Sequence, residues 1–321
     1  MKNQSNHGKG KGNGAQTEIW AVGGGKGGTG KTFVVCQLAT CLASRGNEVI
    51  LIDTDFGGAN VHTFFGIKSR DKSITKFFEE KENLENLIIE SQVKNLSIVP
   101  GNTSPLSPSS FNYAQKIKLF RHIKNLNADY ILLDLGGGTN PDTMDAFLLA
   151  DKMIAVVVPE ITAIENLYQF IKSAYFRKLK SIFGLYGLKQ TAKEFWGNRS
   201  KHGIKTIVDL LDRLKKESND IETILSKELS EFSLNIILNK VRNVQELQEG
   251  FSIKSVCIKY IGVEAHYVGF IEYDYQFWRN LSLIQTAPRF IVSHSTQSEV
   301  EKIAGHIING EQMKIDSLKY V

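Results

Sequence analysis

The feature that most constrains this 321-residue chain is a glycine-rich loop set between an apolar run and a helix-favouring segment. Residues 25–32 match Gly-x-x-x-x-Gly-Lys-Thr, and they follow the apolar run 19–23. Glycines let backbone N–H groups close around phosphates, and the start of the next helix adds the positive end of its dipole. A glycine-rich turn without function is the weaker alternative. The pattern predicts a phosphate-binding loop of Gly25, Lys26, Gly27, Gly28, Thr29, Gly30, Lys31 and Thr32.

Two residues at the end of this motif carry its chemistry. A lysine in the position of Lys31 reaches the β- and γ-phosphates of a bound nucleotide. A hydroxyl in the position of Thr32 ligates Mg²⁺. We therefore expect Lys31 to bind phosphate and to act in catalysis, and Thr32 to be a metal ligand.

The rest of the chain alternates short apolar runs with helix-favouring stretches, which is typical of a mostly parallel sheet flanked by helices. This indicates an α/β fold. Charged, helix-favouring sequence replaces the strand rhythm between about residues 183 and 232, so we expect a helical insertion there. The expected strands are 19–23, 48–53, 96–100, 130–134, 153–158, 234–238 and 266–271, and the expected helices are 31–45, 162–179, 204–216, 221–229 and 298–308.

Composition sets the outer limits of the domain. Residues 1–17 are polar and are expected to form a disordered tail, residues 18–310 one nucleotide-binding domain, and residues 311–321 a C-terminal tail. The net charge of +5 includes three lysines of the N-terminal tail, so charge alone does not indicate nucleic acid, although weak attraction of the tail to anionic surfaces stays open. No apolar run is long enough to span a bilayer, and three cysteines without CxxC spacing fit a reducing cytoplasm.

Two of the expected strands end in carboxylates that a phosphate–Mg²⁺ site needs. Asp53 and Asp55 follow one strand and, two residues apart, would face the same side of an extended chain. Asp134 ends the strand 130–134, in the pattern of a buried strand that delivers a metal-binding carboxylate. Asp134 is therefore predicted to be a metal ligand. Asp53 lies where an adjacent phosphate–Mg²⁺ site would need a carboxylate, with a plain strand-end cap as the alternative.

The early lysine of the loop adds a family resemblance. Lys26 makes the motif Lys-Gly-Gly-Thr-Gly-Lys-Thr, which resembles the deviant Walker A signature of the MinD/ParA family of P-loop ATPases. The resemblance implies ATP as the nucleotide, Mg²⁺ as its metal, and an ATP-dependent homodimer. It also implies that Lys26 acts in trans on the nucleotide of the opposite subunit, much as an arginine finger does. An exposed loop lysine without such a role is the alternative.

Further roles follow from the same resemblance, which covers roughly residues 18–310. The stretch that contains Asp53 and Asp55 and continues to Asn60 looks like switch I. This implies that Asp55 orients the attacking water and that Asp53 is a metal ligand or lies near the Mg²⁺ shell, with a plain strand-end role as the alternative for each. Gly138 falls at the switch II glycine, whose N–H would sense the γ-phosphate. Asn239 falls at the adenine-contacting asparagine, although asparagines after strands are often only turn formers. Residues 269–274 resemble the segment that lines the base, with Glu272 where the family often has proline.

The resemblance is nearest to MinD and to the regulators of flagellar number. It implies a Mg²⁺-dependent ATP-hydrolysing dimer switch that acts as a spatial or assembly regulator and recruits a protein partner of unknown identity in its ATP state. One alternative is a partition ATPase of the ParA type that binds DNA non-specifically. A nucleotide-dependent metal or redox carrier is a weaker alternative, because the cysteines are not placed for it. For the alternative of DNA binding, the basic residues that could contribute to a DNA-binding face are Arg177, Lys178, Lys180 and Lys201.

The two ends of the chain bear on localisation. We expect a cytoplasmic protein, with peripheral contact at the inner face of the cell membrane left open. A short amphipathic membrane helix would have to come from Met313, Ile315, Leu318 and Val321, which are few, so a frayed C-terminus is favoured. The N-terminal tail lacks the Asp-Gln-Ala motif common in regulators of flagellar number.

Overall fold

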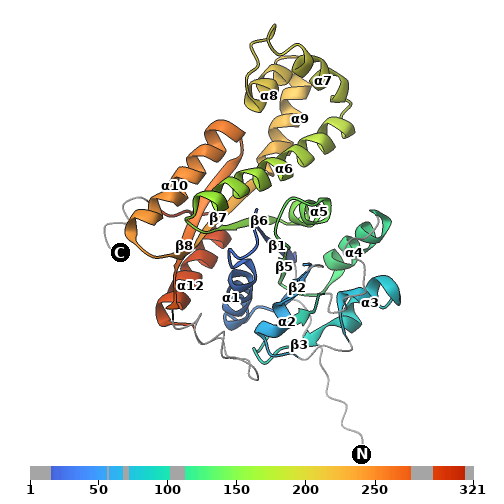
Figure 1. The fold of residues 1–321 in the computed structure, drawn as a ribbon. Helices are drawn as coiled ribbons and strands as arrows, with labels where there is room; N and C mark the ends of the chain where they lie inside the picture. The colour runs from blue at the N-terminus through green and yellow to red at the C-terminus, as the bar shows by residue number, and fades with distance from the viewer. Residues whose placement is uncertain (1–15, 56–57, 68–71, 102–112, 276–291, 315–321) are drawn as a thin grey trace, which may run out of the picture.

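A computed structural model of the chain describes residues 16–55, 58–67, 72–101, 113–275 and 292–314. Within them lies an eight-stranded sheet in the order β3-β4-β2-β5-β1-β6-β7-β8 (Figure 1). Every neighbouring pair is parallel except β3 and β4, which confirms the expected α/β fold. The strands are β1 Glu18–Gly23, β2 Val49–Asp53, β3 Ile89–Glu90, β4 Leu96–Val99, β5 Tyr130–Asp134, β6 Lys152–Val157, β7 Ser233–Val241 and β8 Glu264–Glu272.

Helices connect these strands and cover both faces of the sheet. The helices expected from the sequence are present as α1, α6, α8, α9 and α12, with ends that differ by up to six residues. Others were not expected, namely α2 to α5, α7 and α10. The bounds are α1 Lys31–Ser44, α2 Val61–Phe64, α3 Ile74–Glu79, η1 Leu84–Leu87, α4 Tyr113–Asn125, α5 Pro141–Leu149, α6 Ile161–Leu185, α7 Lys189–Gly197, α8 Ile207–Lys215, α9 Asn219–Ser230, η2 Val244–Glu246, α10 Leu247–Val256, η3 Cys257–Ile261 and α12 His294–Asn309.

The core consists of one apolar layer on each face of the sheet. In β1, Ile19 and Ala21 point into one layer, and Trp20 and Val22 point into the other. Helices α1 and α12 cover the layer of Trp20, whereas α4, α5, α6 and α10 cover the layer of Ile19 (Figure 1). Because both faces of the central strands are buried, the strands read as continuous apolar runs in the sequence.

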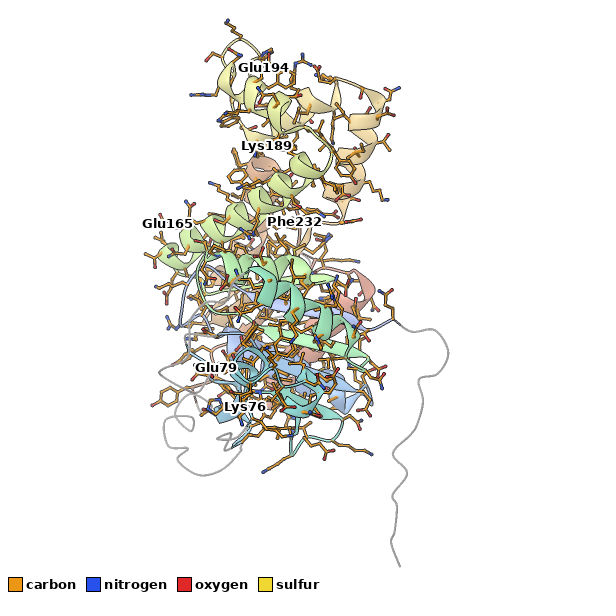
Figure 2. The ribbon with its side chains drawn as sticks, turned by 90° about the vertical axis from the view of Figure 1, so that its right-hand side faces the viewer. Lys76, Glu79, Glu165, Lys189, Glu194 and Phe232 are labelled. Atoms are coloured by element: carbon orange, nitrogen blue, oxygen red, sulfur yellow. The ribbon has the colours of Figure 1, made fainter. Side chains whose placement is uncertain are left out.

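Helices α7, α8 and α9 lie within the stretch 183–232, where an insertion was expected, and project away from the sheet at the end of α6 (Figures 1 and 2). They have an apolar interior of their own, in which Leu214 and Leu225 are fully buried. That interior is continuous with the main core through Tyr175 and Phe232, whose ring centroids are 5.3 Å apart. The insertion is therefore packed onto the sheet domain.

The ends of the described chain are fixed to the domain. The Thr17 hydroxyl donates to the Ala128 carbonyl at 2.7 Å, and the Met313 N–H donates to the Tyr267 carbonyl at 2.7 Å. The remaining parts of the two expected tails, residues 1–15 and 315–321, lie outside the described residues. Among the described residues, no helix combines the length and apolarity needed to cross a membrane.

A buried carboxyl group makes stability depend on pH. The Glu299 carboxylate in α12 accepts a hydrogen bond from the Glu272 N–H at 3.1 Å. Burial raises the pKa of Glu299 from 4.5 to about 7, the hydrogen bond and Lys302 opposing this shift and the Glu272 charge adding to it. The folded state therefore binds this proton more tightly than the unfolded chain does, so this group destabilises the fold progressively as pH rises from about 4.5 to about 7.

We predict that Glu299→Gln, which keeps the acceptor but cannot ionise, unfolds at higher urea concentration than the wild type at pH 8. The gain is at most about 3 kcal/mol, the free-energy equivalent of this pKa difference. At pH 5 the two proteins should unfold at similar urea concentrations. Parallel curves of stability against pH for both proteins would contradict the assignment.

Candidate nucleotide-binding site

The loop of residues 24–30 leaves the central strand β1 at the carboxyl edge of the sheet and leads into α1. Gly28 and Gly30 have φ angles of 82° and 87°, a left-handed conformation that glycine adopts most readily. Gly30 precedes α1 and has no side chain to cap it, so the N–H groups of the first turn are left for a ligand. This is the arrangement that favours anion binding at a helix start.

Close packing behind the loop explains two further glycines. A Cβ atom on Gly24 would lie 2.7 Å from the Val156 carbonyl oxygen, and one on Gly25 would lie 2.0 Å from the Asn166 carbonyl oxygen of α6. A Cβ on Gly27 would meet nothing within 4 Å. The first half of the loop is therefore held between β6 and α6, whereas its middle is open.

Two carboxylates lie side by side next to the loop. β2 and β5 are neighbours, and their register sets Asp53 opposite Asp134. Both side chains are buried, and the Thr32 hydroxyl of α1 donates to Asp134 Oδ2 at 2.7 Å. The structure thus brings together the three residues that the sequence predicted as metal ligands.

The electrostatics of this pair favour a cation. Burial raises the pKa of Asp134, the charge of Asp53 adds to the shift, and Thr32 and Lys31 oppose it. Burial also raises the pKa of Asp53 to about 7. Within the described part of the chain, Asp134 Oδ1 is buried without a hydrogen-bond partner. An unpartnered buried oxygen beside a hydroxyl and a second carboxylate is a donor set that suits Mg²⁺.

Asp53 differs from Asp134 in how its oxygens are used. They accept hydrogen bonds from the N–H groups of Asp55, Asn60 and Val61, at 3.0 to 3.1 Å. Asp53 therefore organises the loop between β2 and α2, and Asp134 retains the free oxygen. The role of Asp53 as a direct metal ligand stays a prediction.

The loop after β5 contacts the phosphate loop, and the loop after β2 contacts the loop after β5. The Gly138 N–H, in a residue with φ of 96°, donates to the Gly24 carbonyl at 3.2 Å. A Cβ on Gly136 would lie 3.0 Å from Asp55 Oδ1. Asp55 and Gly138, which lie 83 positions apart in the sequence, are thus both placed at the site.

The two lysines of the motif have different surroundings. Lys31 is buried, and its ammonium donates to the Lys26 carbonyl at 3.2 Å; burial lowers its pKa, and the charges of Asp134 and Asp55 oppose that shift. The Lys26 side chain is 45% exposed, with its ammonium 3.4 Å from the Thr162 hydroxyl and 4.0 Å from the Glu160 carboxylate. Lys26 therefore lies against the start of α6 and remains accessible to a second molecule.

Asn239, predicted to contact adenine, ends up buried against the loop. Its amide donates to the Thr29 carbonyl at 2.8 Å, and the adenine contact stays a prediction. Beyond it lies a cavity of about 450 Å³ between the ends of β7 and β8. The Arg242 guanidinium lies there 5.3 Å from the centroid of the Tyr273 ring. No pattern in the sequence indicates this position of Arg242, because it depends on how two distant strands end.

Comparison with known proteins places this site in a family. A family model described as an AAA domain matches residues 17–182, just over half of the chain. The chain belongs to the MinD/ParA family of P-loop ATPases. Curated members include the antiactivator FleN of Pseudomonas aeruginosa, 31% identical over 157 residues, which are 48% of this chain and 55% of FleN. The flagellum site-determining protein YlxH of Helicobacter pylori is 29% identical over 174 residues, 54% of this chain and 58% of YlxH.

The chain thus matches little more than half the length of these curated MinD/ParA relatives. Solved structures show the shared fold over a longer stretch. MinD of Pyrococcus horikoshii complexed with Mg-ADP has a TM-score of 0.58 at 19% identity, covering 94% of this chain and all of that one. A plasmid partition protein from Borrelia burgdorferi has a TM-score of 0.58 at 17% identity, covering 92% and 99%. The fold is common to both branches of the family.

The basic residues considered for DNA are partly neutralised in this MinD/ParA-family protein. Arg177 makes two contacts to Asp145, at 2.5 and 2.8 Å. The Lys178 ammonium lies 3.2 Å from Glu228 and 3.4 Å from Glu231. Lys180 and Lys201 are exposed, the latter on the insertion. The four cations therefore do not form one open basic face.

We predict that Gly25→Ala lowers the thermal midpoint of the nucleotide-free protein, whereas Gly27→Ala leaves it within about 1 °C of the wild type. Both substitutions add one methyl group, but only the first forces it against the α6 backbone, at a cost on the order of 1–3 kcal/mol. Differential scanning fluorimetry measures both. Equal midpoints for the two variants would show that the loop is not held against α6.

Proposed function

We propose that this protein is a Mg²⁺-dependent ATPase that works as a dimer switch and regulates the position or assembly of other cell components. The observation that carries the proposal is the contact between Thr32 and Asp134 beneath the phosphate loop, with the second Asp134 oxygen buried and unpartnered. Such a site is suited to Mg²⁺ and a nucleoside triphosphate. The family relationship supports ATP as the nucleotide.

In this proposal the chain binds and orients ATP with groups that already lie together. The N–H groups of the loop and the Lys31 ammonium hold the phosphates, and Lys31 exchanges the Lys26 carbonyl for a phosphate oxygen. Thr32 and Asp134 hold Mg²⁺, with Asp53 beside them. Mg²⁺, when bound, neutralises charge on the phosphate oxygens.

Hydrolysis then needs orientation more than covalent chemistry from the protein. We assign Asp55 to orient the attacking water, because its carboxylate lies next to Gly136 and close enough to Lys31 for their charges to interact. We assign the Gly138 N–H to the γ-phosphate, which requires it to leave the Gly24 carbonyl that it contacts. These assignments rest on the family resemblance and on the placement of both groups at the site.

The dimer part of the proposal rests on the surface around Lys26. Lys26 is accessible, and Ile161 at the start of α6 is 78% exposed. A second copy of the chain would cover this surface and receive Lys26 at its own nucleotide. The insertion of α7, α8 and α9 is our candidate surface for a protein partner, because it projects from the domain (Figure 2).

We propose a cytoplasmic location. The membrane alternative depended on Met313 and on three residues within 315–321. Met313 packs against the core, and residues 315–321 lie outside the described residues. DNA binding is not proposed, because Arg177 and Lys178 are paired with carboxylates.

We predict that Mg²⁺ with a non-hydrolysable ATP analogue doubles the solution mass of the wild type, and that Mg²⁺ with ADP does not. Lys26→Ala should stay monomeric with either nucleotide, because the lysine that reaches the opposite site is gone. Lys189→Ala, on the exposed face of the insertion, is the matched control and should dimerise. Light scattering measures all three proteins. A wild-type mass that never changes with nucleotide would rule out the switch.

We predict that Asp55→Ala retains ATP but loses at least about 100-fold in turnover, since one oriented group typically contributes this much. Because binding survives while hydrolysis fails, ATP itself should trap this variant as a dimer. Phosphate release and light scattering measure the two effects. Phosphate release at the wild-type rate would exclude Asp55 from the reaction.

A further inference from the structure

The end of strand β7 has an irregularity directly behind the phosphate loop. The pairing of β7 with β8 shifts register between Asn239 and Val241, and the residue between them, Lys240, has a φ angle of 60°. Three non-glycine residues in the described part of the chain have positive φ, and Lys240 is the one that lies within a strand. A left-handed backbone is unfavourable for lysine, so a compensating interaction is expected.

The irregularity lets two consecutive side chains reach the same loop. In a regular strand, neighbouring side chains point to opposite faces. Here the Asn239 amide donates to the Thr29 carbonyl at 2.8 Å, and the Lys240 ammonium donates to the Gly28 carbonyl, also at 2.8 Å. The approach is close, since a Cβ on Gly30 would lie 2.3 Å from the Asn239 amide nitrogen. The end of β7 therefore braces the second half of the loop.

These contacts bear on how the loop binds phosphate. When a peptide N–H points into a phosphate cradle, the carbonyl of the same peptide points outward and needs a donor there. Lys240 and Asn239 supply such donors for two successive carbonyls, and so fix the orientation of the peptide groups between Gly28 and Gly30. A loop whose N–H groups are already oriented binds an anion without reorganising.

The position of Lys240 adds charge as well as orientation. Lys240 is partly buried, and burial lowers the pKa of its ammonium, with Glu160 opposing the shift and Arg242 adding to it. Glu160 is also the carboxylate 4.0 Å from the Lys26 ammonium. The loop thus has Lys26 and Lys240 near one carboxylate at the start of α6.

We propose that Lys240 is a positioning residue for the nucleotide. Its ammonium holds the Gly28 carbonyl outward and thereby keeps the loop in the conformation that binds phosphate. The contact offsets the unfavourable left-handed backbone conformation of Lys240. This inference rests on the proposed function, because it requires that the loop bind ATP. It assigns a role to a residue outside the phosphate-loop motif.

The test compares three substitutions at one position. Lys240→Met removes the ammonium and keeps the length of the side chain, Lys240→Arg restores a cation, and Lys240→Gly removes the ammonium and relieves the backbone strain. Calorimetry with Mg²⁺ and ADP or a non-hydrolysable ATP analogue measures affinity, and the thermal midpoint without nucleotide measures stability. Lys216→Met, which removes an exposed lysine of the insertion, is the matched control.

We expect Lys240→Met and Lys240→Gly to bind both nucleotides about ten-fold more weakly, the loss of one charge-assisted hydrogen bond. Lys240→Arg should recover most of the affinity, and Lys216→Met should bind like the wild type. The midpoint of Lys240→Gly should equal or exceed that of the wild type, since glycine adopts this conformation without strain. If Lys240 only supported the fold, Lys240→Gly would lose stability together with affinity. A loss of affinity at an unchanged midpoint therefore indicates a role in binding.

Wild-type affinity in Lys240→Gly and Lys240→Met would overturn the inference and leave the ATPase proposal intact. A lower midpoint in Lys240→Gly in step with its affinity would overturn it as well, since the contact would then support the fold. Failure of the wild type itself to bind either nucleotide would instead overturn the proposed function. The two failures are therefore distinguishable in one set of titrations.

Discussion

The site depends on the burial of two carboxylates side by side. Asp53 and Asp134 end neighbouring parallel strands in register, and both are shielded from water. Burying two like charges together is costly unless donors or a cation offset it. Asp53 has three backbone N–H donors, whereas Asp134 has the Thr32 hydroxyl and the electrostatic support of Lys31. One oxygen of Asp134 is thus left without a donor, in a position that suits a cation next to the phosphate loop.

The same sheet edge collects every other group of the site. β1 leads into the phosphate loop, β2 ends at Asp53 and β5 at Asp134, and β7 carries Asn239 and Lys240 near its end at Val241. Because all four strands are parallel, their carboxyl ends lie along one edge, and their crossovers bring residues more than 200 positions apart into contact. The helical insertion, by contrast, lies between β6 and β7 in the sequence, and it contains none of the site residues at this edge.

How much could be predicted from the sequence depended on how local each signal was. The loop from Gly25 to Thr32 is a contiguous pattern followed by a helix, and the apolar runs that end at Asp53 and Asp134 mark buried strands. Helix α5 was missed because its apolar residues form a short run, Ala146–Leu149, with weak periodicity, although Asn140 and Pro141 mark its start. Helix α4 had a readable signal in Leu119 and Ile123, four residues apart. The role proposed for Lys240 had none, because its direction depends on a register shift between two distant strands.

Helix α6 connects the phosphate loop with the insertion. Gly25 packs so closely on Asn166 that a methyl group does not fit, and Lys26 lies beside Glu160 and Thr162 at the start of the same helix. Helix α6 has 25 residues and therefore spans about 37 Å, reaching from the loop to the insertion. A packed helix moves largely as one body, so a small change of tilt at its first turn becomes a larger displacement at Leu185. Strand β7 runs between the same two places in the opposite direction, from the end of the insertion to the contacts of Asn239 and Lys240 with the loop. Under the proposed function, a change of the partners of Lys26 would therefore act on one of two elements that connect the loop with the insertion.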